Sequence, residues 1–438
     1  MPEVKQTEYR GSIHQRQKEL MLKWYERLNE AAETGTPPTA SLMISGNCVE
    51  LLEAFGAVPI YPEVNALQLA IRHQSLEPIL AAEEIGYAPD NCAYVKADIG
   101  CYLKGITPTG GKLPKPDLVL CNFVGCNTYV KWFEHTAVLT GSKLYVLDVP
   151  FLCEDEPTQA AIDYVVRQLK ELVTLLENIT GKKFDYDRFT EAVRCSAEVE
   201  ELWSQIKHLA RRSPSPFDAY FDAITLMGPL YVYRATQEGV EFFRAALEEM
   251  WAKVASGQGV YDQEKFRLVI EGPPPYPYFR TFSDMFAKWK ACAVASTYST
   301  VGGLWEFGAR HDPDHPFESV ALHMLSQNVT NRNYLQRYEQ IKRYIEEWNA
   351  DGLIIHFVKS CRLFSAGQGD MRDYVTKTLG VPTLYIESDL EDPRYFAEAQ
   401  TRNRIDAFSE TVRKMHDAFG IGAVVEPAGM TQFMDCLF

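Results

Sequence analysis

The sequence lacks the features of an exported, membrane-bound or nucleic-acid-binding protein. Its first residues, MPEVKQTEYRGS, are polar and contain no apolar core, so they do not read as a secretory signal. No uncharged apolar run approaches the roughly 18 residues of a transmembrane helix. The net charge of −15 argues against a general nucleic-acid binder, which needs a basic surface. We therefore expect a cytoplasmic protein with neither a membrane nor a nucleic-acid partner.

Several catalytic signatures are also missing. The glycine-rich segment GITPTGGKL (105–113) lacks the glycine spacing of a phosphate loop and the Ser or Thr that should follow its lysine. GxGxxG after a strand, HExxH, GxSxG and CxxC are absent as well. These absences argue against ordinary nucleotide, zinc-protease, hydrolase and thioredoxin chemistry, and we expect no ATP site on this chain.

The sequence does contain a repeated β/α rhythm. Short apolar runs alternate with amphipathic helical stretches, which is typical of parallel sheets covered by helices on both faces. The pattern predicts an α/β protein with two parallel-sheet domains of the flavodoxin-like or Rossmann-like kind. The expected parts are an N-terminal helical arm (1–38), a first α/β domain (39–185), a helical segment (186–262) and a second α/β domain (263–438).

Ten apolar runs are expected to form strands. In open α/β sheets ligands gather at the carboxyl ends of strands, so the residues that follow these runs are the first candidates for a site. The expected strands are 40–45, 56–61, 92–95, 117–121, 143–148, 266–272, 291–296, 352–358, 382–387 and 422–426.

Three of the ten cysteines occupy similar places in this pattern. Cys92 opens an expected strand, whereas Cys126 and Cys361 each follow a strand and precede a helix. A helix N-terminus offers free N–H groups and positive partial charge, which stabilise thiolates and anionic clusters. The spacings do not form a compact ferredoxin motif. From the residues alone, three unrelated buried thiols remain the simpler interpretation.

Longer segments around these cysteines carry a family resemblance. They are DNCAYVKADIG (90–100), PDLVLCNFVGCNTYVKWFE (116–134) and a stretch from VKSCRLFSAGQGDM to YIESDLEDPRYFAEAQTRNRIDAF (358–408). With them the sequence resembles the benzoyl-CoA reductase/2-hydroxyacyl-CoA dehydratase family over nearly its whole length. Three further segments are most similar to the larger catalytic subunits of its ATP-dependent reductases: RRSPSPFDAYF (211–221), EGPP (271–274) and VASTYSTVGGLWEFGARHDP (294–313).

The resemblance implies a cofactor, partners and a reaction. It implies a [4Fe–4S] cluster on Cys92, Cys126 and Cys361, and an acyl-CoA site shared with a second, similar cysteine-rich subunit. It further implies a separate ATPase module, fed by ferredoxin, that delivers electrons at low potential. The implied reaction reduces the ring of benzoyl-CoA, or of a substituted analogue, to a cyclohexadiene-1-carbonyl-CoA.

Two other functions stay open. The first is a subunit of a radical 2-hydroxyacyl-CoA dehydratase, which would use the same cysteines but recycle one electron. The second, from another class, is a non-catalytic iron–sulfur electron-transfer protein. Acyl-CoA binding would exclude the second.

Candidate substrate-binding residues follow the first expected strand. Ser45, Gly46 and Asn47 form a turn whose N–H groups and side chains would face a thioester. Ser and Asn are also common helix N-caps, and a plain cap is the alternative. Glu63 matches a family position near the substrate and is a candidate for proton transfer. Its alternative is an acidic residue that stabilises the first turn of a helix.

The remaining candidates have weaker support. His311 and His315 lie in RHDPDHP and are candidate proton donors, although a turn rich in Asp and Pro is equally expected there. Cys101 and Cys121 lie near ligand positions but do not match the ligand motif. Structural roles are expected for the other cysteines, which are Cys48, Cys153, Cys195, Cys292 and Cys436.

Overall fold

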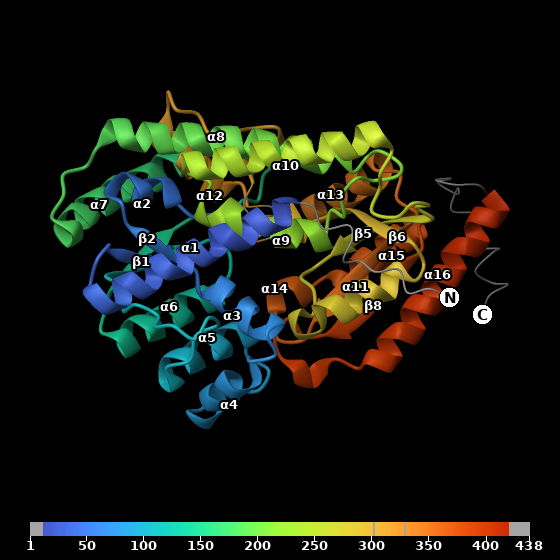
Figure 1. Ribbon diagram of the computed structural model, residues 1–438, viewed down its shortest axis with the longest axis horizontal. Coiled ribbons are helices and arrows are strands. Elements are labelled where there is room, and N and C mark those ends of the chain that lie inside the picture. Colours follow the sequence, from blue (N-terminus) through green and yellow to red (C-terminus); the bar gives the residue numbers. More distant parts are fainter. Residues whose placement is uncertain (1–11, 301–302, 328–329, 420–438) are drawn as a thin grey trace.

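The computed structural model describes residues 12–300, 303–327 and 330–419, and it contains two four-stranded parallel sheets surrounded by helices (Figure 1). The first sheet has the strand order β2-β1-β3-β4 and the second has the order β6-β5-β7-β8. This arrangement confirms the expected α/β class with two parallel sheets. The strands are β1 (Thr39–Ser41), β2 (Val58–Ile60), β3 (Leu118–Phe123), β4 (Lys143–Asp148), β5 (Phe266–Glu271), β6 (Ala291–Ser296), β7 (Gly352–Val358) and β8 (Thr383–Ser388).

Helices connect the strands and cover the sheets. In the first half of the chain they are α1 (Ser12–Thr34), α2 (Val49–Phe55), α3 (Pro62–Ile71), α4 (Leu76–Glu84), α5 (Ala93–Lys104), α6 (Asn127–Thr140), α7 (Gln159–Thr180) and α8 (Tyr186–Leu209). In the second half they are α9 (Phe221–Val232), α10 (Gln237–Ser256), α11 (Phe279–Ala287), α12 (Pro316–Leu325), α13 (Tyr334–Glu347), α14 (Arg362–Ser365), α15 (Gln368–Thr378) and α16 (Glu398–Phe419). Short 3₁₀ turns are η2 (Tyr276–Tyr278), η3 (Tyr298–Thr300), η4 (Leu304–Phe307) and η5 (Pro393–Tyr395).

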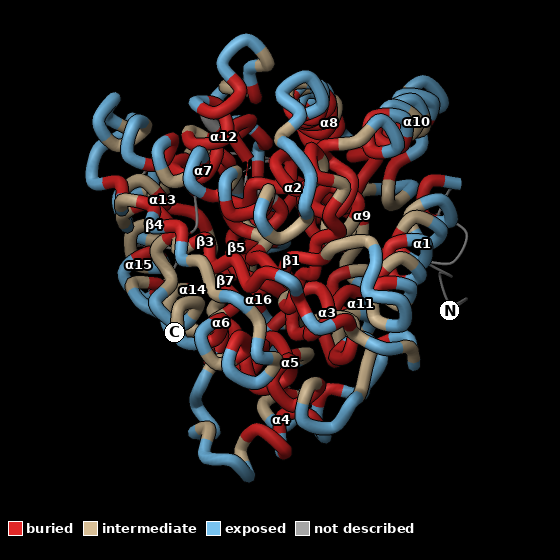
Figure 2. Tube along the Cα trace, turned by 90° about the vertical axis from the view of Figure 1, so that its left-hand side faces the viewer, coloured by how far each residue is buried: buried red, intermediate tan, exposed pale blue. Residues whose placement is uncertain are grey.

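The central strands are buried on both faces, as their composition requires. In β3 the sequence LVLCN is fully buried, and in β7 GLIIH is equally buried. The edge strand β4 is largely accessible, because helices cover it less completely. Figure 2 shows the strands in the buried interior and α10 with an exposed outer face. The two parallel sheets therefore form the rigid frame from which loops project.

Several helices tie the two sheets together. The long helices α8 and α10 pack against each other and run along one side of the molecule (Figure 1). Helix α12, which comes from the second half of the chain, packs on α7 and α8. The interior is consequently shared between the two sheet regions. None of the helices in the described ranges is long and apolar enough to cross a membrane.

One expected strand is wrong. Residues 92–95 were expected as a strand, but Cys92 is the N-cap of α5, and Ala93 begins that helix. Helix α5 is buried on nearly all sides because it packs against α3, α4 and α6. A short apolar run such as CAYV reads the same in a buried strand and in a buried helix, so periodicity could not separate them. The expected strand at 422–426 and Cys436 lie outside the described residues.

Candidate active site

A single cavity collects residues from all eight described strands. Its volume is about 690 Å³. Each strand contributes at least one lining residue within three positions of its carboxyl end. The cavity therefore lies where the carboxyl ends of both sheets face each other, the usual place for ligands in α/β proteins. The residues that follow β1 to β8 in this way are Ile44, Glu63, Gly125, Phe151, Pro273, Tyr298, Ser360 and Leu390.

The three cysteines singled out by the family resemblance all line this cavity. Cys92 is the N-cap of α5, Cys126 is the N-cap of α6 after β3, and Cys361 is the N-cap of α14 after β7. All three are partly exposed, and none forms a disulfide. Residues that lie far apart in the sequence thus present three free thiols to one space.

Burial keeps these thiols neutral unless a cation binds them. Burial, with a smaller contribution from nearby Cys126, raises the pKa of the Cys361 thiol to about 12. Burial likewise raises the pKa of Cys92 well above its ordinary range and raises that of Cys126. Metal binding needs thiolates and releases protons. The site would therefore gain its thiolates only together with a positive metal centre.

The three cavity sulfurs are not all within 4.8 Å of one another. Among the described residues, the one set of His, Cys, Asp or Glu side chains with ligand atoms all within 4.8 Å of one another is Glu200, His311 and His323. At least one pair of cavity sulfurs is therefore farther apart than 4.8 Å. Two sulfurs on one tetrahedral ion, with bonds of about 2.3 Å, lie only about 4 Å apart. A multi-iron cluster, in which each cysteine binds a different iron, suits the wider spacing.

The other cysteines lie elsewhere. Cys101 on α5 and Cys121 on β3 are buried and do not line the cavity. Cys48, Cys195 and Cys292 are also buried, and Cys153 is exposed. These cysteines therefore sit as packed or surface residues, outside the group of three cavity thiols.

Glu63 lies in the cavity wall in the first turn of α3. Its carboxylate accepts hydrogen bonds from the Ile44 N–H at 2.7 Å and from the Tyr129 hydroxyl at 3.1 Å. Burial raises the pKa of Glu63 to about 7, although both hydrogen bonds act in the opposite direction. A carboxyl group with this pKa exchanges protons readily near neutral pH.

The three candidate residues in the turn after β1 lie in different surroundings. Ser45 lines the cavity, and its hydroxyl is 3.1 Å from both the Gln327 Oε1 and the Thr330 hydroxyl. Gly46 has φ of +58°, and a Cβ there would lie 2.8 Å from Val124, so the tight turn requires glycine. Asn47 is fully buried and does not line the cavity.

The side chain of Asn47 instead organises the backbone and a buried ion pair. Its Nδ2 donates to the Ile44 carbonyl at 2.7 Å, and its Oδ1 accepts from the Val49 N–H at 3.2 Å. The same Oδ1 accepts from the guanidinium of Arg234 at 3.0 Å. This geometry gives Asn47 a structural part at the start of α2.

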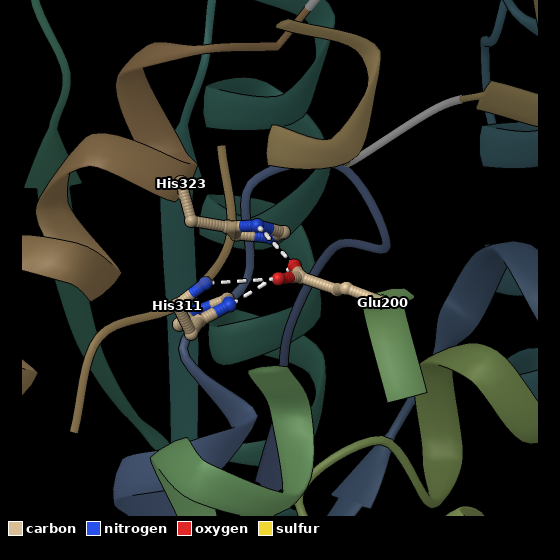
Figure 3. A group of neighbouring side chains, drawn as sticks. All are labelled: Glu200, His311 and His323. Atoms are coloured by element: carbon tan, nitrogen blue, oxygen red, sulfur yellow. Dashed lines mark hydrogen bonds and ion pairs between the residues drawn. The ribbon is translucent and has the colours of Figure 1, made fainter. Parts of the chain in front are cut away.

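His311 lies outside the cavity, in a buried group with Glu200 and His323 (Figure 3). Both imidazoles face the Glu200 carboxylate in Figure 3. The Nδ1 atoms of His311 and His323 are 2.9 Å and 3.6 Å from Glu200 Oε1. His315, the other histidine of this segment, is exposed at the N-cap of α12. Neither histidine reaches the cavity wall.

Two imidazoles and a carboxylate are also a donor set for a divalent transition metal. Here, however, the guanidinium of Arg234 already supplies positive charge to these buried carboxylates and imidazoles. Arg234 lies 2.8 Å from Glu50, and Glu50 lies 3.6 Å from His311 Nε2. Burial opposes ionisation of Glu200, yet the adjacent imidazoles lower its pKa below the ordinary range. We therefore interpret the group as a buried ion network that joins α2, α8 and α12.

The aromatic and basic side chains that line the cavity were not identified from the sequence. Tyr94, Tyr129, Trp132 and Tyr298 line the cavity and contribute aromatic rings to its largely apolar surface. Tyr94 lies two residues after Cys92, and Tyr129 lies three residues after Cys126, so proximity to the cysteines was the available signal. Basic residues of the wall are Arg332, Arg337 and Arg362.

These features define an α/β protein with a largely apolar cavity, lined by three thiols and several aromatic rings, between two parallel sheets. Residues 45–412 match the family model described as 2-hydroxyglutaryl-CoA dehydratase, D-component, and the chain belongs to this family. A benzoyl-CoA reductase subunit of Thauera aromatica is 39% identical over 406 residues, which cover 91% of this chain and 94% of that protein. The family resemblance read from the sequence is thereby confirmed.

Other relatives belong to the dehydratase branch. The (R)-2-hydroxyisocaproyl-CoA dehydratase alpha subunit of Clostridioides difficile is 32% identical over 403 residues, covering 90% of this chain and 95% of that protein. The (R)-phenyllactyl-CoA dehydratase alpha subunit of Clostridium sporogenes is 28% identical, covering 83% of this chain and 87% of that protein. The chain is an enzyme subunit of this family.

Proposed function

We propose that this chain is the iron–sulfur catalytic subunit of an ATP-dependent benzoyl-CoA reductase. It would reduce the ring of benzoyl-CoA, or of a substituted analogue, to a cyclohexadiene-1-carbonyl-CoA. The observation that carries the proposal is the convergence of Cys92, Cys126 and Cys361 on one cavity that also contains Glu63. The similarity to a reductase of benzoyl-CoA favours this reaction within the family.

Cys92, Cys126 and Cys361 would hold a [4Fe–4S] cluster. The residues fit such a group, since three free thiols that are not all within 4.8 Å of one another line one space. The N-termini of α5 and α6 meet this space and add positive partial charge, which favours an anionic centre. A cluster bound there would supply electrons one at a time at low potential.

The cavity suits a flat acyl group. Its volume of about 690 Å³ lies within the usual range for small-molecule sites. Aromatic wall residues such as Trp132 and Tyr298 would pack against a ring and exclude water. Water in the site would otherwise take up electrons from a strong reductant through its protons. Arg332 and Arg362 would place positive charge near the anionic CoA portion.

Polar groups of the wall would act on the thioester. Ser45 lines the cavity, and its hydroxyl would hydrogen-bond the acyl portion. Glu63, with a pKa of about 7, would hold or move a proton beside the substrate. Gly46 would support both by keeping the turn after β1 tight.

The proposal includes partners. A second homologous cysteine-rich subunit would complete the acyl-CoA site, and an ATPase module fed by ferredoxin would deliver electrons. The Thauera aromatica relative is named as one subunit of its reductase, which supports an enzyme built from several chains. The missing phosphate loop supports an energy source on another chain.

A second candidate function is a role in a radical 2-hydroxyacyl-CoA dehydratase. It is favoured by the description of the matching family model and by the two dehydratase relatives. The same cavity and cysteines would serve it. Loss of water from a 2-hydroxyacyl-CoA would replace net reduction.

Electron counting separates the candidates. The anaerobic complex with its second subunit and ATPase module is supplied with a titrated electron donor and either benzoyl-CoA or a 2-hydroxyacyl-CoA. We expect two electrons consumed for each benzoyl-CoA converted. Many 2-hydroxyacyl-CoA turnovers for each electron would instead identify a dehydratase. Failure to bind either acyl-CoA would leave an electron-transfer protein as the function.

A further inference from the structure

Three tyrosines from separate segments meet at the cavity. Tyr94 on α5 and Tyr298 on η3 line it, and Tyr276 on η2 is buried behind them with 1% of its surface exposed. The Tyr276 hydroxyl donates a hydrogen bond of 2.8 Å to the Tyr298 hydroxyl. The rings of Tyr94 and Tyr276 are stacked, with centroids 6.3 Å apart. A hydrogen-bonded pair of phenols, with the Tyr94 ring stacked on that of Tyr276, thus adjoins the cavity that the three cysteines line.

The direction of the hydrogen bond distinguishes the two phenols. Because Tyr276 is the donor, the proton of Tyr298 is not used in this bond. Tyr298 also belongs to the cavity wall, whereas Tyr276 does not. A negative charge that formed on the Tyr298 oxygen would keep its hydrogen bond from Tyr276. Charge-assisted hydrogen bonds are stronger than neutral ones, so this arrangement favours loss of the Tyr298 proton.

Electrostatics point the same way. Burial raises the pKa of both phenols of the pair, and it raises that of Tyr276 well above the ordinary range. For Tyr298 the hydrogen bond from Tyr276 opposes burial, and its pKa rises only to about 12. Tyr298 is thus the more acidic phenol of the pair.

On the basis of the proposed function, we propose that Tyr298 is a catalytic proton donor to the thioester carbonyl oxygen of the acyl-CoA. Tyr276 is a positioning residue that orients the Tyr298 hydroxyl and stabilises its phenolate. Tyr298 lies in the family-like segment 294–313, but the resemblance assigned no role to it, and Tyr276 lies outside the matching segments. The proposed role of Tyr298 is the same for ring reduction and for dehydration, because both reactions begin with the addition of an electron to an acyl thioester.

The step balances in protons and electrons. The proposed reaction would add one electron, from a low-potential one-electron donor, to the thioester, and negative charge would then lie on the carbonyl oxygen. The O–H bond of Tyr298 breaks and an O–H bond forms on the substrate, so the added electron and proton leave the substrate neutral. The Tyr298 phenolate, held by Tyr276, then regains a proton from water before the next turnover.

The test compares Tyr298→Phe and Tyr276→Phe with the control Tyr374→Phe in the assembled anaerobic enzyme. Tyr374 carries a partly exposed phenol that is hydrogen-bonded to Glu339 and lies outside the cavity. We expect Tyr298→Phe to lower turnover about 10²-fold and Tyr276→Phe to lower it roughly tenfold. Iron content should match wild type in all three, and Tyr374→Phe should leave turnover unchanged.

Two further readouts separate catalysis from packing. Equilibrium binding of benzoyl-CoA, measured without electron donor, should weaken roughly fivefold to tenfold in Tyr298→Phe because one hydrogen bond is lost. The solvent deuterium isotope effect on turnover should be altered in Tyr298→Phe. Incorporation of 3-fluorotyrosine at position 298 keeps the fold and makes the phenol more acidic, so the alkaline limb of the pH profile should move to lower pH.

The experiment distinguishes failure of the proposed role of Tyr298 from failure of the proposed function. If wild type turns over while Tyr298→Phe and 3-fluorotyrosine at 298 leave rate, isotope effect and pH profile unchanged, Tyr298 is not the proton donor and the proposed function stands. If wild type binds no acyl-CoA at all, the proposed function and this inference fall together.

Discussion

The hydroxyl of Tyr129, in the first turn of α6, donates a hydrogen bond of 3.1 Å to the carboxylate of Glu63, in the first turn of α3. The two residues lie 66 positions apart in the sequence, and both line the cavity. Tyr129 follows Cys126 on the same helix. The contact therefore couples the cysteine-bearing turn of α6 to the acid that sits beside the expected substrate.

The pH–rate profile of turnover should show an ionisation near pH 7 that belongs to Glu63. Burial raises the pKa of Glu63 to about 7, so the carboxyl changes protonation within the working range. Glu63→Gln should remove that ionisation from the pH–rate profile and lower turnover about 10²-fold, while iron content remains that of wild type. An unchanged profile would return Glu63 to a role at the start of α3.

The same shift predicts the sign of a stability change. The folded-state pKa of Glu63 lies above its unfolded value, so the folded state binds more protons and stability falls as pH rises from about 4.5 to about 7. Glu63→Gln removes this loss. We expect the variant to resemble wild type below pH 4.5 and to gain up to about 3 kcal/mol at pH 8 in chemical denaturation.

Replacing Cys92, Cys126 or Cys361 by Ala should abolish one [4Fe–4S] cluster for each chain. Each variant removes one of the three thiols that line the cavity. Anaerobic iron analysis and EPR spectroscopy provide the measurement. Cys195→Ala is the matched control, since Cys195 is a buried thiol on α8 outside the cavity. Full iron content in Cys361→Ala would refute the ligand assignment.

Substitutions of Ser45 and Asn47 should have different effects, the first on activity and the second on stability. Ser45→Ala should lower turnover and leave iron content intact, because its hydroxyl lies in the cavity wall. Asn47→Ala should destabilise the fold by about 1–3 kcal/mol, since it removes buried hydrogen bonds to Arg234 and to the Ile44 carbonyl. Denaturation curves and kinetics of both variants provide the comparison. The reverse pattern would place Asn47, and not Ser45, at the substrate.

His311→Ala should destabilise the fold by about 3–5 kcal/mol, because it leaves the Glu200 carboxylate without its closest partner in the interior. His315→Ala, on the exposed end of the same segment, should change stability by less than about 0.5 kcal/mol. Both are measured by chemical denaturation at pH 7.

The pH dependence of the network has a definite sign. The adjacent imidazoles lower the pKa of Glu200, so its contribution is present above the unfolded pKa and is lost as pH falls. The stability difference between wild type and Glu200→Gln should therefore shrink below about pH 4. A difference that grows on acidification would contradict the ion-network interpretation.

Much of the fold could be predicted because its signals are local. Apolar runs such as DLVLC and GLIIHFV coincide with β3 and β7, since a strand buried on both faces needs a continuous apolar stretch. Cys126 and Cys361 could be placed at strand ends for the same reason. Cys92 could not, because a buried helix and a buried strand of four residues have the same composition. Its family motif indicated the residue without its structural setting.

The sequence by itself determined the α/β class, the family and the three cysteines that resemble cluster ligands. Only the tertiary structure decided which polar residues share their cavity. Ser45 and Asn47 are neighbours in the chain, yet one lines the cavity and the other holds Arg234 in the interior. His311 lies in a segment that matches the family but packs against Glu200 on α8. The physical reason is that strand order and helix packing bring together segments that lie far apart in the sequence, as with Ser45 after β1 and Thr330 between β6 and β7, and no local pattern encodes that meeting.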